Sequence, residues 1–133
     1  MDIKSKITQM TLDEKTKLLS GYKTMNTYPI NRLDIPSLNL SDGPNGLRKE
    51  DESGDSLNGV SNSLPSTCFP TGVTLASTWN KNLLYKVGKA IGEECNYYDI
   101  NVLLGPATNI KRNPKCGRNF EYYSEDPLLS GYL

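Results

Sequence analysis

An amphipathic helix followed by a short apolar strand is the feature that most restricts how this chain can fold. Leu84, Val87 and Ile91 recur at helical spacing, and Val102–Leu104 then forms an apolar run typical of a buried strand. Short strands are also predicted at residues 37–40 and, directly before the helix, at residues 69–77. The strand at 69–77, the helix and the strand at 102–104, in this order, imply a right-handed crossover between parallel strands. The pattern therefore predicts an α/β fold.

The N-terminal part of the chain predicts smaller elements. Thr11 and Glu14 have the spacing of a capping box, which indicates a short helix through residues 15–19. Gly21 follows, and a glycine at this point can end the helix in the left-handed conformation. Residues 22–36 contain two prolines and little periodicity, so they are predicted to be a connecting loop.

The segments around the central helix are also patterned. Residues 69–77 resume apolar character and predict a further strand, and Asn80 is a favourable N-cap for the helix. Gly88 and Gly92 lie four residues apart in a segment rich in Lys and Glu, which favours close packing of a soluble helix on a sheet. Residues 49–66 are rich in Ser, Asp, Asn and Gly and predict a surface loop.

Composition excludes several classes of function. The chain has 133 residues, the size of one domain, and Lys plus Arg and Asp plus Glu both number 15, so no basic excess favours a nucleic-acid partner. There is no His, and Cys68, Cys95 and Cys116 lack metal-ligand spacing, so neither a metal nor an organic cofactor is expected. The N-terminal residues lack the apolar stretch of a signal peptide or membrane span. A cytoplasmic protein with reduced thiols and no membrane partner is expected.

A long polar segment, residues 105–131, follows the strand predicted at 102–104. Loops that leave the carboxyl ends of buried strands carry substrate-contacting groups in many α/β enzymes. Asp126 and Pro127 have the pattern of a helix start near the end of this segment. The charged residues of the segment that we consider as candidates are Lys111, Arg112, Arg118 and Glu121.

Another acidic and basic pair follows the strand predicted at 37–40. Asp42 is separated from Arg48 by a turn that contains Gly and Pro. Carboxylate oxygens accept from paired hydroxyls and guanidinium groups donate in a fixed fork, so these groups suit a polyhydroxylated neutral ligand. The alternatives are a phosphate ligand, although no Gly-rich phosphate loop is present, a structural salt-bridge network, or an Asx-turn in which Asp42 bonds only its own backbone.

Three sequence motifs occur in order through nearly the whole chain. They are Ser41-Asp-Gly-Pro-Asn-Gly-Leu-Arg48, the segment from Cys68-Phe-Pro-Thr-Gly72 to Trp79, and Asn109-Ile-Lys-Arg-Asn-Pro-Lys-Cys-Gly-Arg-Asn-Phe-Glu-Tyr-Tyr-Ser-Glu-Asp-Pro127. Together they resemble glycoside hydrolase family 3, most closely its β-glucosidase and β-xylosidase branch.

The resemblance implies a (β/α)8 TIM-type barrel with its active site at the carboxyl ends of the strands. Residues 1–133 would form an N-terminal portion of that barrel, with about two to three strands and flanking helices, because a complete barrel takes about 250 residues. The remainder of the barrel and a second domain are expected to lie outside this chain. An open sheet leaves an unpaired edge, so the isolated chain is expected to be poorly stable.

The resemblance also implies roles for individual residues. Asp42, Arg48 and Arg118 would bind the non-reducing-end sugar of a β-linked glucoside or related saccharide. Glu121 fits better as a group that orients an arginine than as an acid catalyst. The supporting residues of the site are predicted to be Glu121, Lys111 and Arg112.

The departures from the family pattern limit what this chain can do. Family members use a Lys-His pair to bind sugar, an Asp nucleophile in a later strand and a still later general acid, and none of these falls within the chain. Retaining hydrolysis needs two carboxyl groups roughly 5 Å apart. We therefore assign no catalytic residue and expect an inactive part of a retaining β-glycosidase. The alternatives are an interaction fragment that folds only with a complementary chain carrying the rest of the barrel, and a degenerate sugar-binding module.

Overall fold

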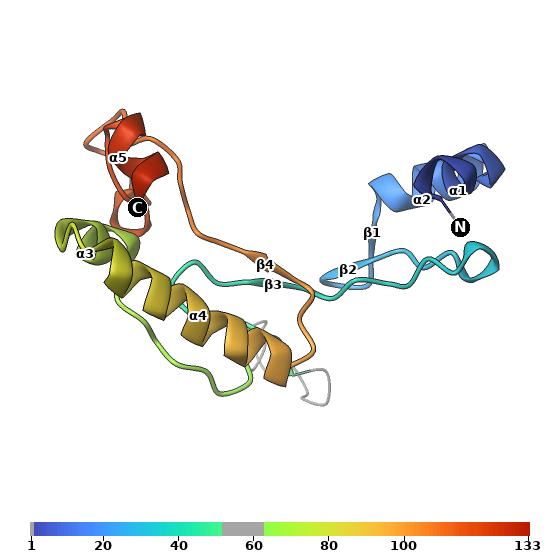
Figure 1. The fold of residues 1–133 in the computed structure, drawn as a ribbon, viewed down its shortest axis with the longest axis horizontal. Coiled ribbons are helices and arrows are strands. Elements are labelled where there is room, and N and C mark those ends of the chain that lie inside the picture. Colours follow the sequence, from blue (N-terminus) through green and yellow to red (C-terminus); the bar gives the residue numbers. More distant parts are fainter. Residues whose placement is uncertain (1, 52–62) are drawn as a thin grey trace.

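The computed structural model describes residues 2–51 and 63–133, which form two lobes joined by an extended segment (Figure 1). We call residues 2–38 the arm, and the described residues from 39 onward the body. Most of the surface loop predicted at 49–66 lies outside the described residues. Within the described ranges, no helix is long and apolar enough to cross a membrane.

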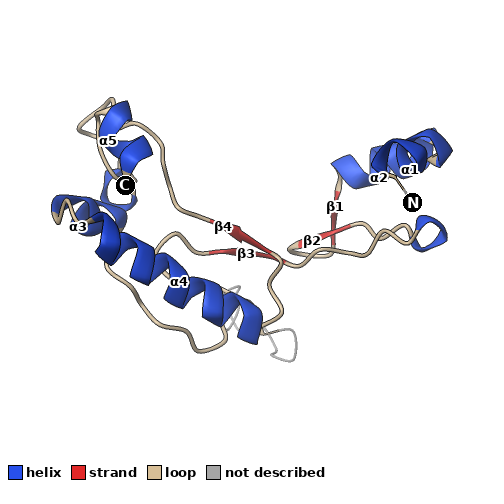
Figure 2. Ribbon diagram, in the orientation of Figure 1, coloured by secondary structure: helices blue, strands red, loops and turns tan. Residues whose placement is uncertain are grey.

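Helices dominate both lobes, and the strands are short (Figure 2). The arm contains α1 (Ile3–Gln9), α2 (Leu12–Leu19), β1 (Gly21–Tyr22), β2 (Asn26–Thr27) and the 3-10 helix η1 (Asn31–Leu33). The body contains β3 (Leu40–Asp42), α3 (Gly72–Ser77), α4 (Lys81–Tyr97), β4 (Val102–Leu104), the 3-10 helix η3 (Asn119–Glu121) and α5 (Pro127–Tyr132).

A parallel sheet with α4 between its strands in the sequence is present, as predicted, but the strand that pairs with residues 102–104 is β3 and not residues 69–77. β3 and β4 pair in parallel, with Leu40 opposite Val102 and Asp42 opposite Leu104, and α4 connects them. Asn80 caps α4, because its Oδ1 accepts from the backbone N–H of Leu83 at 3.1 Å. The apolar side of α4 packs between the strands and the segment after β3, in a buried cluster of Leu47, Ile91, Cys95 and Ile100.

The strand predicted at residues 69–77 is wrong, because this segment contains helix α3. Leu75 and Ala76 are buried, and they lie next to each other on one side of a single helical turn. Gly72 brings the start of α3 against η3, where a Cβ would overlap the carbonyl oxygen of Glu121. A short apolar run fits a strand or a helix equally well by periodicity, and here the contact with η3 selects the helix.

Two predictions about glycines are also wrong. Gly21 does not end α2 in the left-handed conformation, because Ser20 is extended and Gly21 begins the β1–β2 hairpin. That hairpin and η1 occupy much of the loop predicted at 22–36. Gly88 and Gly92 do not pack against a sheet, since a Cβ built on either would meet no atom within 4 Å.

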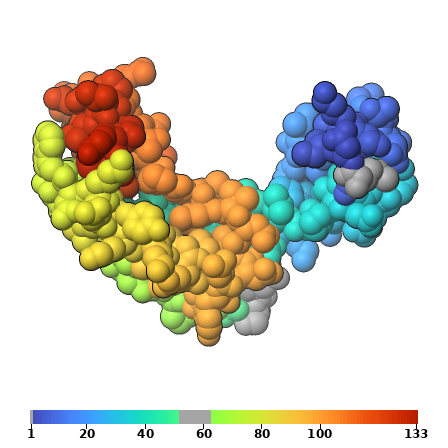
Figure 3. Space-filling view, in the orientation of Figure 1, coloured from blue at the N-terminus to red at the C-terminus, as the bar shows by residue number. Residues whose placement is uncertain are grey.

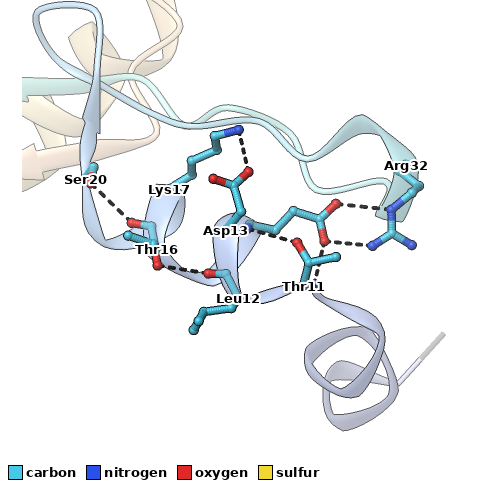
Figure 4. Close-up of polar contacts among 8 residues, drawn as sticks. Thr11, Leu12, Asp13, Thr16, Lys17, Ser20 and Arg32 are labelled. Atoms are coloured by element: carbon cyan, nitrogen blue, oxygen red, sulfur yellow. Dashed lines mark hydrogen bonds and ion pairs between the residues drawn. The ribbon is translucent and has the colours of Figure 1, made fainter.

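The predicted capping box at the start of α2 is present, and a side chain of η1 bonds to it. The Glu14 N–H donates to Thr11 Oγ1 at 3.2 Å, and the Thr11 N–H donates to Glu14 Oε2 at 2.8 Å. Arg32 of η1 extends toward the first turn of α2 (Figure 4), where its Nη2 donates to Glu14 Oε2 at 2.7 Å. Arg32, followed by the Thr11 backbone, lowers the pKa of Glu14 from 4.5 to about 2.

The contact between Arg32 and Glu14 is sensitive to acid. Because the folded-state pKa of Glu14 is depressed, the contribution of the contact is present above about pH 4.5 and is lost as the pH falls toward about 2. We expect an NMR titration of the Glu14 carboxyl carbon to have its midpoint near 2, and Arg32→Gln to move it toward 4.5. Lys4→Gln on exposed α1 is the control and should leave it low. A midpoint near 4.5 in the unaltered chain would show that Arg32 does not hold Glu14 in solution.

Candidate functional site

The turn after β3 exposes the Asp42 carboxylate at the carboxyl end of the strand. Gly43 and Gly46 have φ values of 145° and 131°, which side-chain-bearing residues rarely adopt. The turn closes where the Arg48 N–H donates to the Asp42 carbonyl at 2.9 Å, and the Gly43 N–H donates to Asp42 Oδ1 at 3.0 Å. The Asp42 side chain thus accepts from the N–H of the next residue, and not from the residue two positions on as in an Asx-turn. It remains exposed.

Arg118 is held beside this turn by Glu121. The Arg118 Nε–H donates to Glu121 Oε1, and the side chain of Arg118 is 71% exposed whereas that of Glu121 is 10% exposed. Glu121, and to a smaller extent Asp42, raise the pKa of Arg118. Glu121 thus holds the Nε–H of Arg118, while the rest of the guanidinium group remains largely exposed. This is the geometry expected if Glu121 orients Arg118. The sugar-binding role of Arg118 stays a prediction.

One open pocket gathers three of the six predicted site residues. Asp42, Arg48 and Glu121 line this pocket of about 280 Å³ at the carboxyl end of β3. Phe120 and Cys68 line the same pocket, and the Phe120 side chain is 53% exposed. Sequence reasoning did not assign either residue. The sequence feature that could have indicated Phe120 is its position between the candidates Arg118 and Glu121.

Lys111 and Arg112 lie elsewhere. Both line a different open pocket of about 450 Å³, together with Asn113 and Glu125. The structure therefore brings Arg118 and Glu121 toward Asp42 but leaves the other two basic residues outside that pocket. Among the residues with described positions, no group of three or more His, Cys, Asp or Glu side chains could hold a metal ion.

The chemistry of the pocket around Asp42 is that of a hydroxyl-binding site. A carboxylate offers lone pairs on two oxygens, and the two guanidinium groups offer only donors, so neighbouring hydroxyls can be engaged as both donors and acceptors. Arg118 does not line the pocket but pairs with Glu121, so that two carboxylates and two guanidinium groups balance in charge, which suits a neutral ligand better than a phosphate.

Comparisons with known proteins identify the family of the chain. Residues 52–133 match the family described as the Glycosyl hydrolase family 3 N terminal domain. The thermostable beta-glucosidase B of Acetivibrio thermocellus is 52% identical over 133 residues, which are 100% of this chain and 18% of that protein. An exo-alpha-(1->6)-L-arabinopyranosidase of Bifidobacterium longum is 45% identical over 126 residues, which are 95% of this chain and 17% of that protein.

The fold comparison gives the same result. The crystal structure of a beta-glucosidase from Kluyveromyces marxianus in complex with glucose matches with a TM-score of 0.86 and 40% identity, over 99% of this chain and 15% of that chain. The chain thus spans less than a fifth of the length of these relatives. Its two parallel strands, with α4 between them, are part of a TIM-type barrel. The chain belongs to glycosyl hydrolase family 3, as a portion of the N-terminal barrel domain of a β-glucosidase-like protein.

Proposed function

We propose that residues 1–133 form one side of the glycone subsite of a retaining β-glycosidase that releases terminal, non-reducing, β-linked sugars. The observation that carries the proposal is the pocket at the carboxyl end of β3. It gathers Asp42, Arg48 and Glu121, and Glu121 holds Arg118 beside them. Active sites of TIM barrels lie at this face, because the loops that follow the strands converge there.

Each side chain has a defined task in this proposal. Asp42 accepts hydrogen bonds from hydroxyls of the terminal sugar, while Arg48 and Arg118 donate to its oxygens. Phe120 presents a half-exposed ring at the rim, where an aromatic face can cover the apolar side of a sugar ring. Glu121 is a positioning residue, because it acts through Arg118.

The chain by itself is proposed to be inactive. Retaining hydrolysis uses one carboxylate as nucleophile and a second carboxyl group as acid and base. In the pocket, Glu121 is committed to Arg118, and Asp42 is committed to sugar hydroxyls and to the Gly43 N–H. Neither is left as a free nucleophile opposite a general acid.

A direct assay tests the inactivity. The purified chain should release no nitrophenol from 4-nitrophenyl β-glucoside above the level of a buffer blank. Release that the variant Asp42→Asn abolishes would show that the chain contains a complete catalytic pair. Saturable binding of glucose without turnover would instead favour the sugar-binding module.

The role of Asp42 is testable in a chimera. Residues 1–133 would replace the 133 matching residues of the Acetivibrio thermocellus beta-glucosidase B. Asp42→Asn should lower kcat/KM for an aryl β-glucoside at least about 100-fold, because hydrogen bonds from two hydroxyls to a charged acceptor are lost. The matched control is Asp34→Asn, an exposed position in the left-handed conformation that Asn tolerates. A loss for Asp42→Asn no larger than for the control would refute the sugar-binding role.

The position of η3 offers a separate test of Arg118. In the same chimera, Gly72→Ala should force η3 away from α3, because the new Cβ would overlap the carbonyl oxygen of Glu121. Displacing the Arg118–Glu121 pair should raise KM roughly tenfold, since a shift of about 1 Å in a positioning group is costly. Gly21→Ala is the control, because its Cβ meets nothing within 4 Å. An unchanged KM for Gly72→Ala would mean that η3 does not position the sugar-binding arginine.

A further inference from the structure

One wall of the proposed sugar-binding pocket is an irregular segment. Residues 66–68 line the pocket together with the turn that joins Asp42 to Arg48. We call residues 64–69 the wall segment, which contains neither helix nor strand. Because no helical or ladder bonds hold its backbone, the position of this segment depends on the bonds that it makes to neighbouring parts of the body.

The wall segment is fitted closely to the turn. Three contacts join the two, namely Asn45 with Phe69, Gly46 with Thr67, and Leu47 with Ser66. The Phe69 N–H donates to the Asn45 carbonyl at 2.9 Å. A Cβ built on Gly46 would come within 2.2 Å of the Thr67 carbonyl oxygen, so the two backbones are in close contact. A displacement of the wall segment would therefore displace the turn, and Asp42 with it.

Glu94 connects the wall segment to α4. Its carboxylate oxygens accept from the Thr67 N–H at 3.2 and 3.4 Å. Tyr98, at the end of the same helix, donates from its hydroxyl to the Pro65 carbonyl. In the space-filling view, light green residues of the wall segment border α4, which is yellow to orange (Figure 3). Since another side of α4 belongs to the buried cluster of the body, the helix is a firm support for this segment.

From these contacts we infer that Glu94 is a positioning residue for sugar binding, because it holds the wall segment against the turn that carries Asp42 and Arg48. Glu94 does not line the pocket itself, so its effect reaches the sugar through Thr67 and the turn. The inference rests on the proposed function, since it takes the turn to be part of the glycone subsite. Sequence reasoning did not assign Glu94, which lies 52 residues after Asp42 on a different element.

The test compares two substitutions of Glu94 in the chimera. Glu94→Ala should raise KM for an aryl β-glucoside roughly tenfold and change kcat less than about twofold, because misplaced sugar-binding groups weaken binding before and during the reaction alike. Glu94→Gln should keep KM within about twofold, since its carbonyl oxygen can still accept from the Thr67 N–H. Both variants lose the charge, so the difference between them reports the hydrogen bond.

The matched control is Glu93→Ala on the same helix. The Glu93 side chain is 69% exposed and lies 3.8 Å from Lys89, and its removal should change KM less than about twofold. A purely structural role of Glu94 would lower the active fraction, and hence the apparent kcat, without raising KM. An unchanged KM for Glu94→Ala, or an increase that Glu94→Gln or Glu93→Ala shares, would overturn the inference.

A measurement on the chain alone tests the contact without any activity. Hydrogen exchange followed by NMR should show the Thr67 amide protected in the unaltered chain and in Glu94→Gln. In Glu94→Ala the same amide should exchange at least about tenfold faster, because its acceptor is removed. A Thr67 amide that is unprotected in the unaltered chain, or equally protected in Glu94→Ala, would contradict the role of Glu94.

The outcomes also separate this inference from the sugar-binding role of Asp42. If Asp42→Asn lowers the activity of the chimera while Glu94→Ala leaves KM unchanged, the role of Asp42 stands and that of Glu94 fails. If Glu94→Ala raises KM while Asp42→Asn leaves the activity unchanged, the role of Asp42 fails and the positioning by Glu94 stands. An inactive chimera would overturn both.

Discussion

The parallel pairing of β3 with β4 is the constraint on which the site depends, and Asn39 fixes where that pairing begins. Its backbone carbonyl accepts from the N–H groups of Asn101 and Val102 at 2.9 and 3.1 Å. Its side-chain N–H donates to the Asp99 carbonyl at 2.9 Å, and its Oδ1 accepts from Asn26 of the β1–β2 hairpin at 2.6 Å. The side chain of Asn39 therefore joins the arm to the loop before β4, and its backbone carbonyl joins that loop and β4 to the start of β3. A slip of one residue in β3 would turn Asp42 to the opposite face of the sheet.

Two carboxylates near the end of this ladder have different surroundings and therefore different uses. Glu121 is buried, and its charge is compensated by Arg118, which makes it a structural anchor. Asp42 is exposed on a glycine-rich turn, and its one side-chain hydrogen bond to a neighbouring N–H leaves acceptor capacity for a ligand. Glu121 and Asp42 have the same functional group, so the difference between their roles follows from their burial.

The two lobes differ in how they are stabilised. The arm has a small core of Met10, Ile30 and Leu33, and the exposed contact between Arg32 and the capping box lies beside it. The body has a larger apolar cluster, but much of the surface of β4 and α4 faces solvent. Since surface ion pairs contribute little and uncovered apolar area contributes nothing, each lobe is stabilised mainly by its buried cluster.

Local patterns were enough to predict several elements from the sequence. The spacing of Leu84 and Ile91 predicted α4, and Thr11 and Glu14 predicted the capping box. Asp126 before Pro127 predicted the start of α5, where Asp126 Oδ1 accepts from the Leu128 N–H. These predictions were correct because the interactions involve residues within about one or two helical turns. The sequence motifs likewise identified Asp42, Arg48 and Arg118 as candidates before any contact was known.

Only the tertiary structure decided the features that depend on distant neighbours. Within residues 69–77, Gly72–Ser77 form helix α3, and the start of this helix packs against Glu121, which lies far away in the sequence. Lys111 and Arg112 share a segment with Arg118 but line another pocket, and Phe120 joins Asp42 because the ends of β3 and β4 bring their loops together. Periodicity reports which face of an element is apolar, whereas the surface that meets that face is determined by chain topology and packing.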